Sequence, residues 1–406
     1  MRGTGTRTPV TTEVSAGEAE GVAALTRCVG DPLRFANERW SREPLHRRGA
    51  DPAAFADLFS LGDVDHLISG AALRTPAFRL VKDGRPLPPE AYTKTGRIGS
   101  RPLSDLADPG RIYELFAGGA TIVLQSLHRS WPPLTRFCRA LELALTHPVQ
   151  VNVYVTPPTS RGLGVHHDGH DVFVLQVHGA KQWDVYERGD ETGAAQPCIS
   201  GELSPGDALY IPRSFPHAAR TARSASVHLT IGILSMTWRD ALRRSLDEIL
   251  AEPAFDAPLP VGFAQDPAAL RAGIAEHLGE LAGRVEKLDP GLLAQGAAER
   301  FWSSRPPLLT GQLQALLALD DITDDTVLRR RPGSVCRLRA TRERLVVSLG
   351  DRELRLPLRL EPVLQAVAAS PSLTVGELGP GTLDRPGRLV LARRLVREGL
   401  LEVVVG

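Results

Sequence analysis

Short runs of alternating hydrophobic and polar positions follow one another through the middle of the chain. They are rich in β-branched and aromatic residues, and Gly, Pro or Asp turn signals bound each of them. Strands are therefore predicted at residues 121–128, 149–155, 171–179, 181–187, 207–215 and 226–234. Short strands at nearly regular spacing are typical of an antiparallel sandwich or barrel. One helix, predicted at about 133–146, interrupts the series.

Helical patterns lie on both sides of this region. Residues 22–75 are mainly helical in pattern, and the stretch "DPLRFANERWSREPLHRRG" predicts a helix that stops before Pro44. After Trp238, apolar residues recur at three- and four-residue steps, which predicts helices at residues 238–252, 267–286 and 290–301. Helices outside a barrel need a surface to bury against, so this segment is expected to form a dimer.

The final part of the chain mixes both kinds of pattern. A helix is predicted near 311–318, the strand-like runs "RERLVVSLG" and "RELRLPL" follow, and further helices are predicted near 360–369 and 386–399. This mixture indicates a small winged-helix-like α+β domain. The predicted organisation is a disordered tail, a barrel domain, a helical dimerisation segment and the winged-helix-like domain, at residues 1–21, 22–238, 239–304 and 305–406.

Composition and charge limit the classes of function. The chain has 406 residues, 42% of them hydrophobic and 23% charged, as expected for a globular protein of two or three domains. A net charge of +1 gives no bulk attraction to nucleic acid or to a membrane. Residues 305–406 hold 16 Arg against 12 Asp and Glu. That excess is too small to predict DNA binding, because counterion release needs cations clustered on one face.

The cysteines and the N-terminus indicate a cellular compartment. No apolar run is long enough to span a bilayer, and "MRGTGTRTPVTTEVSAGEAEG" lacks the apolar core of a signal peptide. The four cysteines are scattered without a CxxC pair, at Cys28, Cys138, Cys198 and Cys336. Reduced thiols and a cytoplasmic location are therefore expected.

A candidate metal site precedes one predicted strand, in "GVHHDGHDVFVLQVHGAKQW". In a strand, residues two apart project to the same face, so His166 and Asp168 point together. His217 in "GDALYIPRSFPHAA", 51 residues after His166, is the best third ligand. Two histidines and one carboxylate form the facial triad of non-haem Fe(II) oxygenases. The spacing also suits other divalent ions, and a lone His-x-Asp usually binds no metal. His167, His170 and Asp171 remain alternative ligands.

These motifs together resemble a known family. The stretches "NVYVTPP", "GLGVHHDGHDVFVLQVHGAKQWDVYE" and "LSPGDALYIPRSFPHAA" are similar to the JmjC/cupin-type 2-oxoglutarate oxygenases of the ribosomal-oxygenase group. The likeness extends upstream through "FANERWSREPLHRRG" and "GGATIVLQSLHRSWPPL", and more loosely beyond residue 238. It implies a mainly β double-stranded β-helix (jelly-roll/cupin, JmjC-type) barrel with flanking helices, followed by a helical dimerisation segment and a winged-helix-like domain.

The resemblance also implies roles for single residues. His166, Asp168 and His217 match the iron ligands, and Lys181 matches the lysine that grips the distal carboxylate of 2-oxoglutarate. A compact ammonium group suits that task where a guanidinium would be too bulky, and only four of the 48 basic residues are lysines. Positions that line the co-substrate pocket are matched by Asn152, Tyr154 and His228, for which a purely structural role is the alternative.

Other conspicuous residues are expected to be structural. Trp183 and Tyr186 are assigned to the core, and "RRRPG" at residues 329–333 to a solvated turn.

By resemblance, the protein is expected to be an Fe(II)- and 2-oxoglutarate-dependent dioxygenase that uses O2 to hydroxylate a protein side chain. The β-carbon of Arg or His in a ribosomal protein is the substrate implied, and a homodimer is the assembly implied. A hydroxylase of peptide natural products, a non-oxidative metal-binding cupin and a transcription factor with a sensor barrel are the alternatives. Lysine demethylation would use the same chemistry. Neither a membrane nor a nucleic acid is expected as a partner.

Overall fold

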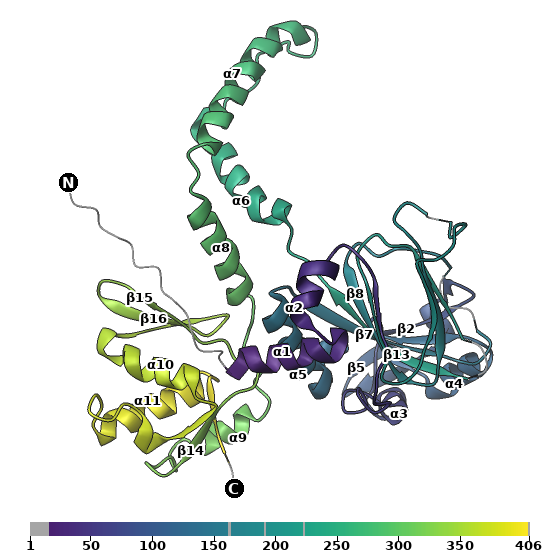
Figure 1. Ribbon diagram of the computed structural model, residues 1–406, viewed down its shortest axis with the longest axis horizontal. Coiled ribbons are helices and arrows are strands. Elements are labelled where there is room, and N and C mark those ends of the chain that lie inside the picture. Colours follow the sequence, from purple (N-terminus) through teal and green to yellow (C-terminus); the bar gives the residue numbers. More distant parts are fainter. Residues whose placement is uncertain (1–15, 161–163, 191, 222–223, 405–406) are drawn as a thin grey trace.

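The computed structural model describes residues 16–160, 164–190, 192–221 and 224–404. It comprises a β-rich barrel domain, an arm of three helices that stands away from it, and a C-terminal module (Figure 1). Residues 1–15, most of the predicted tail, lie outside the described part of the chain. Helix α1 (Ala16–Val29) begins five residues before the predicted end of that tail at residue 21.

The helices of the barrel domain cover one side of its larger sheet. They are α1, α2 (Pro32–Arg34), α3 (Leu61–Gly70), α4 (Pro109–Ala117) and α5 (Pro132–Leu145), and a π-helical turn (Phe35–Arg39) continues α2. A capping box between Ser60 and Asp63 fixes the start of α3. The helix predicted at 133–146 is confirmed as α5, which packs against α1.

An antiparallel eight-stranded sheet forms the larger wall of the barrel. Its order is β1-β11-β8-β13-β7-β6-β2-β3. The strands in chain order are β1 (Leu45–Arg47), β2 (Phe78–Lys82), β3 (Arg85–Pro86), β6 (Thr121–Leu124), β7 (Val149–Thr156), β8 (Asp171–His178), β11 (Ala208–Ile211) and β13 (Ser226–Ile233). The predicted strands at 149–155, 171–179 and 226–234 are confirmed as β7, β8 and β13.

A smaller sheet faces the first one. It consists of β10 (Ile199–Leu203), β9 (Lys181–Val185) and β12 (His217–Arg220) in that order. Phe173 and Leu175 of β8 pack against the helices, while Val172 and Val174 on its other face pack against the smaller sheet. Burial on both faces explains why β8 reads as an almost continuous apolar run.

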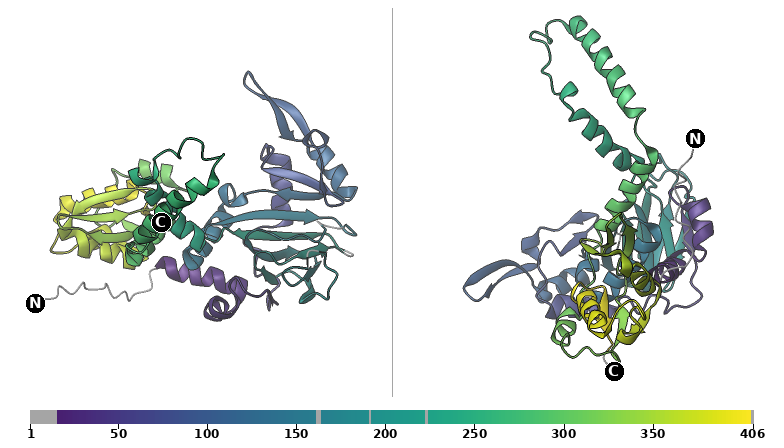
Figure 2. Two further views of the ribbon diagram at one scale, coloured as in Figure 1. Left: turned by 90° about the horizontal axis from the view of Figure 1, so that it is seen from above. Right: turned by 90° about the vertical axis from the view of Figure 1, so that its left-hand side faces the viewer.

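Several strands had no clear sequence signal. Strands β10 and β12 are short and partly polar, and only tertiary pairing on β9 defines them. A separate hairpin of β4 (Thr93–Ile98) and β5 (Arg101–Ala107) projects from the barrel domain (Figure 2). It lies in a region for which the sequence predicted no strands.

The arm contains α6 (Trp238–Leu250), α7 (Pro267–Val285) and α8 (Pro290–Ser303), as the sequence predicted (Figures 1 and 2). A capping box between Thr237 and Asp240 starts α6 immediately after the last barrel strand. Both α7 and α8 contact α6. Among the described residues, no helix is long and apolar enough to cross a membrane.

The C-terminal module has a hydrophobic core of its own. One sheet has the order β18-β14-β19 and a second the order β15-β16-β17. Its elements are α9 (Gln312–Leu317), β14 (Val327–Arg330), β15 (Arg337–Ala340), β16 (Arg344–Ser348), β17 (Glu353–Pro357), α10 (Glu361–Ala369), β18 (Ser372–Thr374), α11 (Arg385–Arg397) and β19 (Leu401–Val403). The predicted helices near 360–369 and 386–399 are confirmed as α10 and α11.

The prediction of a solvated turn at residues 329–333 is wrong for its central arginine. Arg331 is 2% exposed and donates hydrogen bonds to Thr310 O and Gln312 Oε1, both at 2.6 Å. Its charge lies 3.5 Å from Glu402. The arginine therefore ties the segment before α9 to β19, a role that depends on contacts distant in sequence.

Candidate metal centre

The three predicted ligands lie together at one end of the space between the two sheets. His166 forms an isolated β-bridge with His217, with backbone N–H···O distances of 3.1 and 2.8 Å. This bridge brings the segment before β8 beside the first residue of β12. One ligand atom each from His166, Asp168 and His217 lies within 4.8 Å of the others. No other such group of three occurs among the described residues.

Hydrogen bonds to backbone carbonyls orient both imidazole rings. Nδ1 of His166 lies 2.9 Å from Gly164 O, and Nδ1 of His217 lies 3.0 Å from Phe215 O. Because a carbonyl oxygen only accepts, each Nδ1 carries the proton and each Nε2 keeps its lone pair. Nε2 of His217 lies 3.7 Å from the Asp168 carboxylate. The carbonyl contacts at Nδ1 fix the tautomer that a metal requires, and Nε2 and the carboxylate face the same point.

Burial also favours the neutral form of the His217 ring. It lowers the pKa of His217, and the neighbouring His166 lowers it further. The neutral ring is the form that binds a metal. Two neutral imidazole nitrogens and one carboxylate oxygen on a single triangular face suit a six-coordinate non-haem Fe(II) ion and leave three positions for other ligands. The side chains present therefore fit the metal that the sequence motif implies.

Two of the alternative ligands have structural roles instead. Asp171 is fully buried and accepts hydrogen bonds from Tyr210, Ser235 and the Arg213 amide. His170 packs on Gly232, where an added Cβ would lie 2.7 Å from the His170 Nε2 atom. His167 is exposed beside the site and is not part of the three-residue group. The structure therefore favours Asp168 as the carboxylate ligand.

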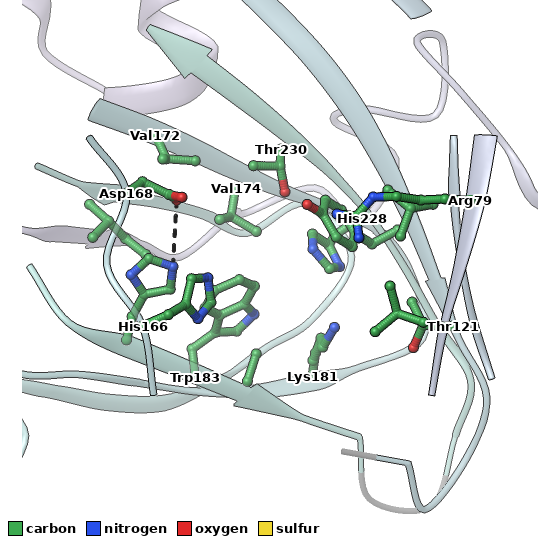
Figure 3. A pocket seen from close by; sticks show the side chains of 16 residues that line it. Arg79, Thr121, His166, Asp168, Val172, Val174, Lys181, Trp183, His228 and Thr230 are labelled. Carbon is green, nitrogen blue, oxygen red and sulfur yellow. Dashed lines mark ion pairs between the residues drawn. The ribbon is translucent and has the colours of Figure 1, made fainter. Parts of the chain in front are cut away.

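A cavity of about 190 Å³ extends from these ligands into the barrel. Drug-sized pockets begin at about 300 Å³, so this one suits a small molecule. Figure 3 shows His166 and Asp168 at one end and Arg79, Thr121 and Lys181 toward the other. Besides the three ligands, the lining residues come from eight strands: Arg79, Val81, Thr121, Val123, Tyr154, Val172, Val174, Lys181, Trp183, Ile211, Ala219, His228 and Thr230.

Lys181 is a buried cation without a counter-charge. Its side chain is 3% exposed, and Nζ donates to Thr156 Oγ1 at 3.2 Å. No carboxylate among the described residues forms an ion pair with it. Burial lowers the pKa of the ammonium group to about 7. An unpaired buried lysine is costly, so its presence here indicates an anionic ligand.

Aromatic rings connect the two ends of the cavity. Tyr154 stacks on His228 at 5.1 Å, and Trp183 lies 5.4 Å from His228 and 6.1 Å from His217. Trp183 Nε1 and His228 Nδ1 are buried and have no hydrogen-bond partner among the residues that the structure describes. Burial, with Lys181 nearby, holds the pKa of His228 well below its ordinary value. Trp183 is therefore a lining residue, and its assignment to the core alone was incomplete. Trp183 lies two residues after Lys181 on the same strand, so the two side chains share a face. That alternation could have predicted that Trp183 lines the cavity.

Arg79 on β2 was not identified from the sequence. Its Nε donates to Gln125 Oε1 at 2.8 Å, and its guanidinium hydrogen-bonds the Tyr154 hydroxyl. It gives the inner end of the cavity a second positive charge. The sequence did not predict β2, so the alternation of side chains along that strand could not be used to place Arg79 on its inner face.

Asn152 does not line the cavity. It shares a face with Tyr154 on β7, but its Oδ1 accepts from the Ser126 amide at 3.0 Å. This contact fits the purely structural role that was the alternative for Asn152. Tyr154 and His228 do line the cavity, as predicted from the resemblance.

Fold and site together define a JmjC/cupin barrel with a His/Asp/His metal site. Residues 126–241 match the family described as JmjC domain, a span that contains the ligand set. This part of the chain is thus similar to a JmjC domain, and a longer part is similar to ribosomal oxygenases. It is 28% identical over 318 residues to ribosomal oxygenase 1 of Rattus norvegicus, covering 70% of this chain and 51% of that protein. With ribosomal oxygenase 2 of Bos taurus it shares 30% identity over 264 residues, covering 60% and 52%.

A solved structure shows the same fold. The Escherichia coli ribosomal oxygenase YcfD, in complex with cobalt and 2-oxoglutarate, matches with a TM-score of 0.50 at 19% identity. The match covers 92% of this chain and 98% of YcfD. By contrast, this chain spans about half the length of the curated relatives that it matches.

Proposed function

We propose that the protein is an Fe(II)- and 2-oxoglutarate-dependent dioxygenase that hydroxylates an amino-acid side chain. One observation carries this proposal: a single small cavity has a His/Asp/His set at one end and the buried, unpaired Lys181 at the other. A 2-oxo dicarboxylate has a chelating end and an anionic end, which match these two features. A metal cupin that uses no dicarboxylate would have no need of this lysine.

The protein's residues hold and orient the reactants. His166, Asp168 and His217 would hold the metal, and Lys181 would pair with the distal carboxylate, with Arg79 and Tyr154 beside it. When bound, iron and 2-oxoglutarate supply the oxidising chemistry, in which O2 is consumed, 2-oxoglutarate becomes succinate and CO2, and a C–H bond becomes C–OH. Val172, Val174 and Trp183 line the space between and exclude water.

We propose a protein or peptide as the substrate, with the β-carbon of Arg or His in a ribosomal protein as the favoured target. The names of the relatives support the ribosomal protein. The cavity would be occupied by 2-oxoglutarate and does not bear on which side chain is hydroxylated. Tailoring of a peptide natural product is the second candidate within the same chemistry.

The direct test is succinate formation from 2-oxoglutarate by purified protein with Fe(II) and ascorbate, wild type beside His166→Ala. We expect succinate from the wild type and at least a hundredfold less from the variant, because two ligands hold iron poorly. Calorimetric binding of 2-oxoglutarate to the Co(II)-loaded protein separates two negative results. Binding without succinate would mean that turnover needs the substrate, whereas no binding would support the non-oxidative cupin.

The remaining parts of the predicted organisation are also proposals. We propose that α6–α8 form a homodimer interface, because the arm exposes large apolar side chains that include Leu242, Leu246, Leu250, Ile274 and Leu278. The C-terminal module is proposed as a winged-helix-like domain on the basis of its helices and its β15–β17 sheet. A cytoplasmic location is supported by four free thiols, two of them buried.

A further inference from the structure

The positive charge of the C-terminal module is concentrated in one sheet. Residues 336–360, which contain β15, β16 and β17, hold seven arginines and three acidic residues. The rest of residues 305–406 holds nine arginines and nine acidic residues. The small excess found from the sequence is therefore local rather than spread over the module.

The strand register places these arginines on one face. Arg339 pairs with Val346, which pairs with Arg355 across the sheet. Arg337 and Arg344 share the same face by the two-residue repeat of their strands, as does one acidic residue, Glu353, which pairs with Ser348. We call Arg337, Arg339, Arg344 and Arg355 the basic face. The alternate residues Leu345, Val347 and Leu354 point the other way, into the core of the module.

The basic face differs from the other arginine-rich element, α11. On α11, Arg385 and Arg388 pair with Asp324, Arg394 pairs with Glu398, and Arg393 donates to backbone carbonyls. On the basic face, Arg339, Arg344 and Arg355 are exposed, and no ion pair to a described carboxylate involves them. The positive charges of α11 are thus largely neutralised within the protein, and those of the basic face are not.

A groove continues this face toward the arm. Its volume is about 910 Å³, with Arg337 and Arg339 on the sheet side and Arg300 and Trp302 of α8 on the other. Three acidic residues also line it: Glu248, Glu299 and Glu353. The Arg337 guanidinium lies 5.0 Å from the centroid of the Trp302 ring. Nη2 of Arg300 is buried, and no described residue forms a hydrogen bond with it. The groove is therefore of mixed charge, and the exposed arginines of the basic face carry the excess of positive charge beside it.

We propose that the basic face binds the phosphate backbone of a nucleic acid. Charge complementarity identifies the partner as a polyanion, and the lack of apolar anchors favours a nucleic acid over an acidic protein. Protein interfaces depend on buried apolar and aromatic side chains at their centre. The central side chain of this face, Val346, is only 7% exposed and offers no such anchor. Phosphate binding needs only clustered, unpaired cations, and arginine is the side chain best suited to it.

The test is fluorescence anisotropy with the full-length protein and three labelled probes: single-stranded RNA, duplex RNA and duplex DNA. Four phosphate contacts predict that affinity for a duplex falls about a hundredfold between roughly 50 and 200 mM salt. In the variant Arg339→Gln/Arg355→Gln, the slope of log affinity against log salt concentration should be less steep by about two units. Whichever probe binds most tightly identifies the kind of nucleic acid.

The matched control is Arg385→Gln/Arg394→Gln, which removes the same net charge from paired arginines of α11. We expect the control to bind like the wild type, and both variants to keep the wild-type melting temperature. Equal weakening in both variants would overturn the proposal, because it would indicate only bulk charge. Absence of binding at low salt would also overturn it. So would equal affinity for polyglutamate, which would identify an acidic protein as the partner.

Discussion

The burial of Lys181 favours an anionic ligand in the cavity. Its ammonium group is almost completely removed from water, and within the described part of the chain it has one hydroxyl partner and no counter-charge. A pKa of about 7 means that the empty cavity holds a largely neutral lysine at mildly alkaline pH. A carboxylate beside it would favour the charged form and raise that pKa. Ligand binding and protonation should therefore be coupled.

We predict that binding of 2-oxoglutarate to the Co(II)-loaded protein takes up close to one proton at about pH 8.5. The uptake should fade as the pH falls through about 7, because the free protein is already protonated there. Calorimetry in two buffers with different ionisation enthalpies measures it.

The variant Lys181→Met should bind without this uptake and about 10- to 100-fold more weakly, since it loses a charge-assisted hydrogen bond. Its affinity for Co(II) should be unchanged. Proton uptake that persisted in the variant would show that another group titrates, and would remove Lys181 from the binding site.

At the scale of elements, strand alternation organises the site. The larger sheet buries one face under helices and turns the other toward the smaller sheet, so each strand can contribute one or two side chains to the cavity. Rigid strands therefore hold the functional groups, with the exception of His166 and Asp168 on the connection before β8. A bridge to His217 and the Ser214 N–H donating to Asp168 O at 2.9 Å stabilise that connection.

The arm permits a prediction about one helix. Leu242, Leu246 and Leu250 repeat every four residues along α6 and are all exposed. Burial of each leucine in a dimer would contribute about 1.5–3 kcal/mol. We expect Leu246→Gln/Leu250→Gln to weaken a dimer at least about a hundredfold, as measured by light scattering over a concentration series.

The control for the arm lies on the opposite face of α6, where Arg244→Gln/Glu248→Gln changes the same number of exposed side chains and removes only their mutual ion pair. This control should remain a dimer. A monomeric wild type would exclude the proposed interface, and dissociation of both variants would point to loss of helix stability instead.

At the scale of the whole molecule, a buried ion cluster joins the barrel domain to the C-terminal module. Glu142 of α5 pairs with Arg139 and with Arg305, and Arg139 Nη1 donates to Pro306 O at 2.9 Å and to Gly333 O at 3.4 Å. The side chains of both arginines are 9% exposed. Removal of one partner from such a cluster leaves buried charge uncompensated, which is more costly than loss of a surface pair.

We predict that Glu142→Gln lowers the free energy of unfolding by about 3–5 kcal/mol and weakens the contact between the barrel domain and the C-terminal module. Hydrogen exchange should increase around residues 304–310, where the chain enters the module. The matched control is Glu43→Gln, which breaks an exposed pair with Arg39 and should cost at most about 1 kcal/mol. Equal effects of the two changes would show that the cluster contributes no more than a surface ion pair.

The sequence by itself determined the elements whose signal is local. The period of apolar residues located β7, β8, β13, α5 and the arm helices, because burial on a strand or helix face imposes that period on the chain. It also indicated His166, Asp168 and His217 together, through the His-x-Asp spacing and a histidine that follows a recognisable turn. The expectation that His166 and Asp168 lie in a strand was wrong, because both lie on the connection before β8. Lys181 stood out because lysine is rare in this chain.

Only the tertiary structure decided which residues share an environment. Arg79 reaches the cavity through a strand with no clear sequence pattern, Asn152 is engaged by the Ser126 amide instead, and Arg331 is buried by distant segments. The arginines of α11 and those of the basic face look alike in sequence, and only folding pairs one set with carboxylates. Burial and charge pairing depend on contacts between segments far apart in the chain, which the sequence pattern does not record.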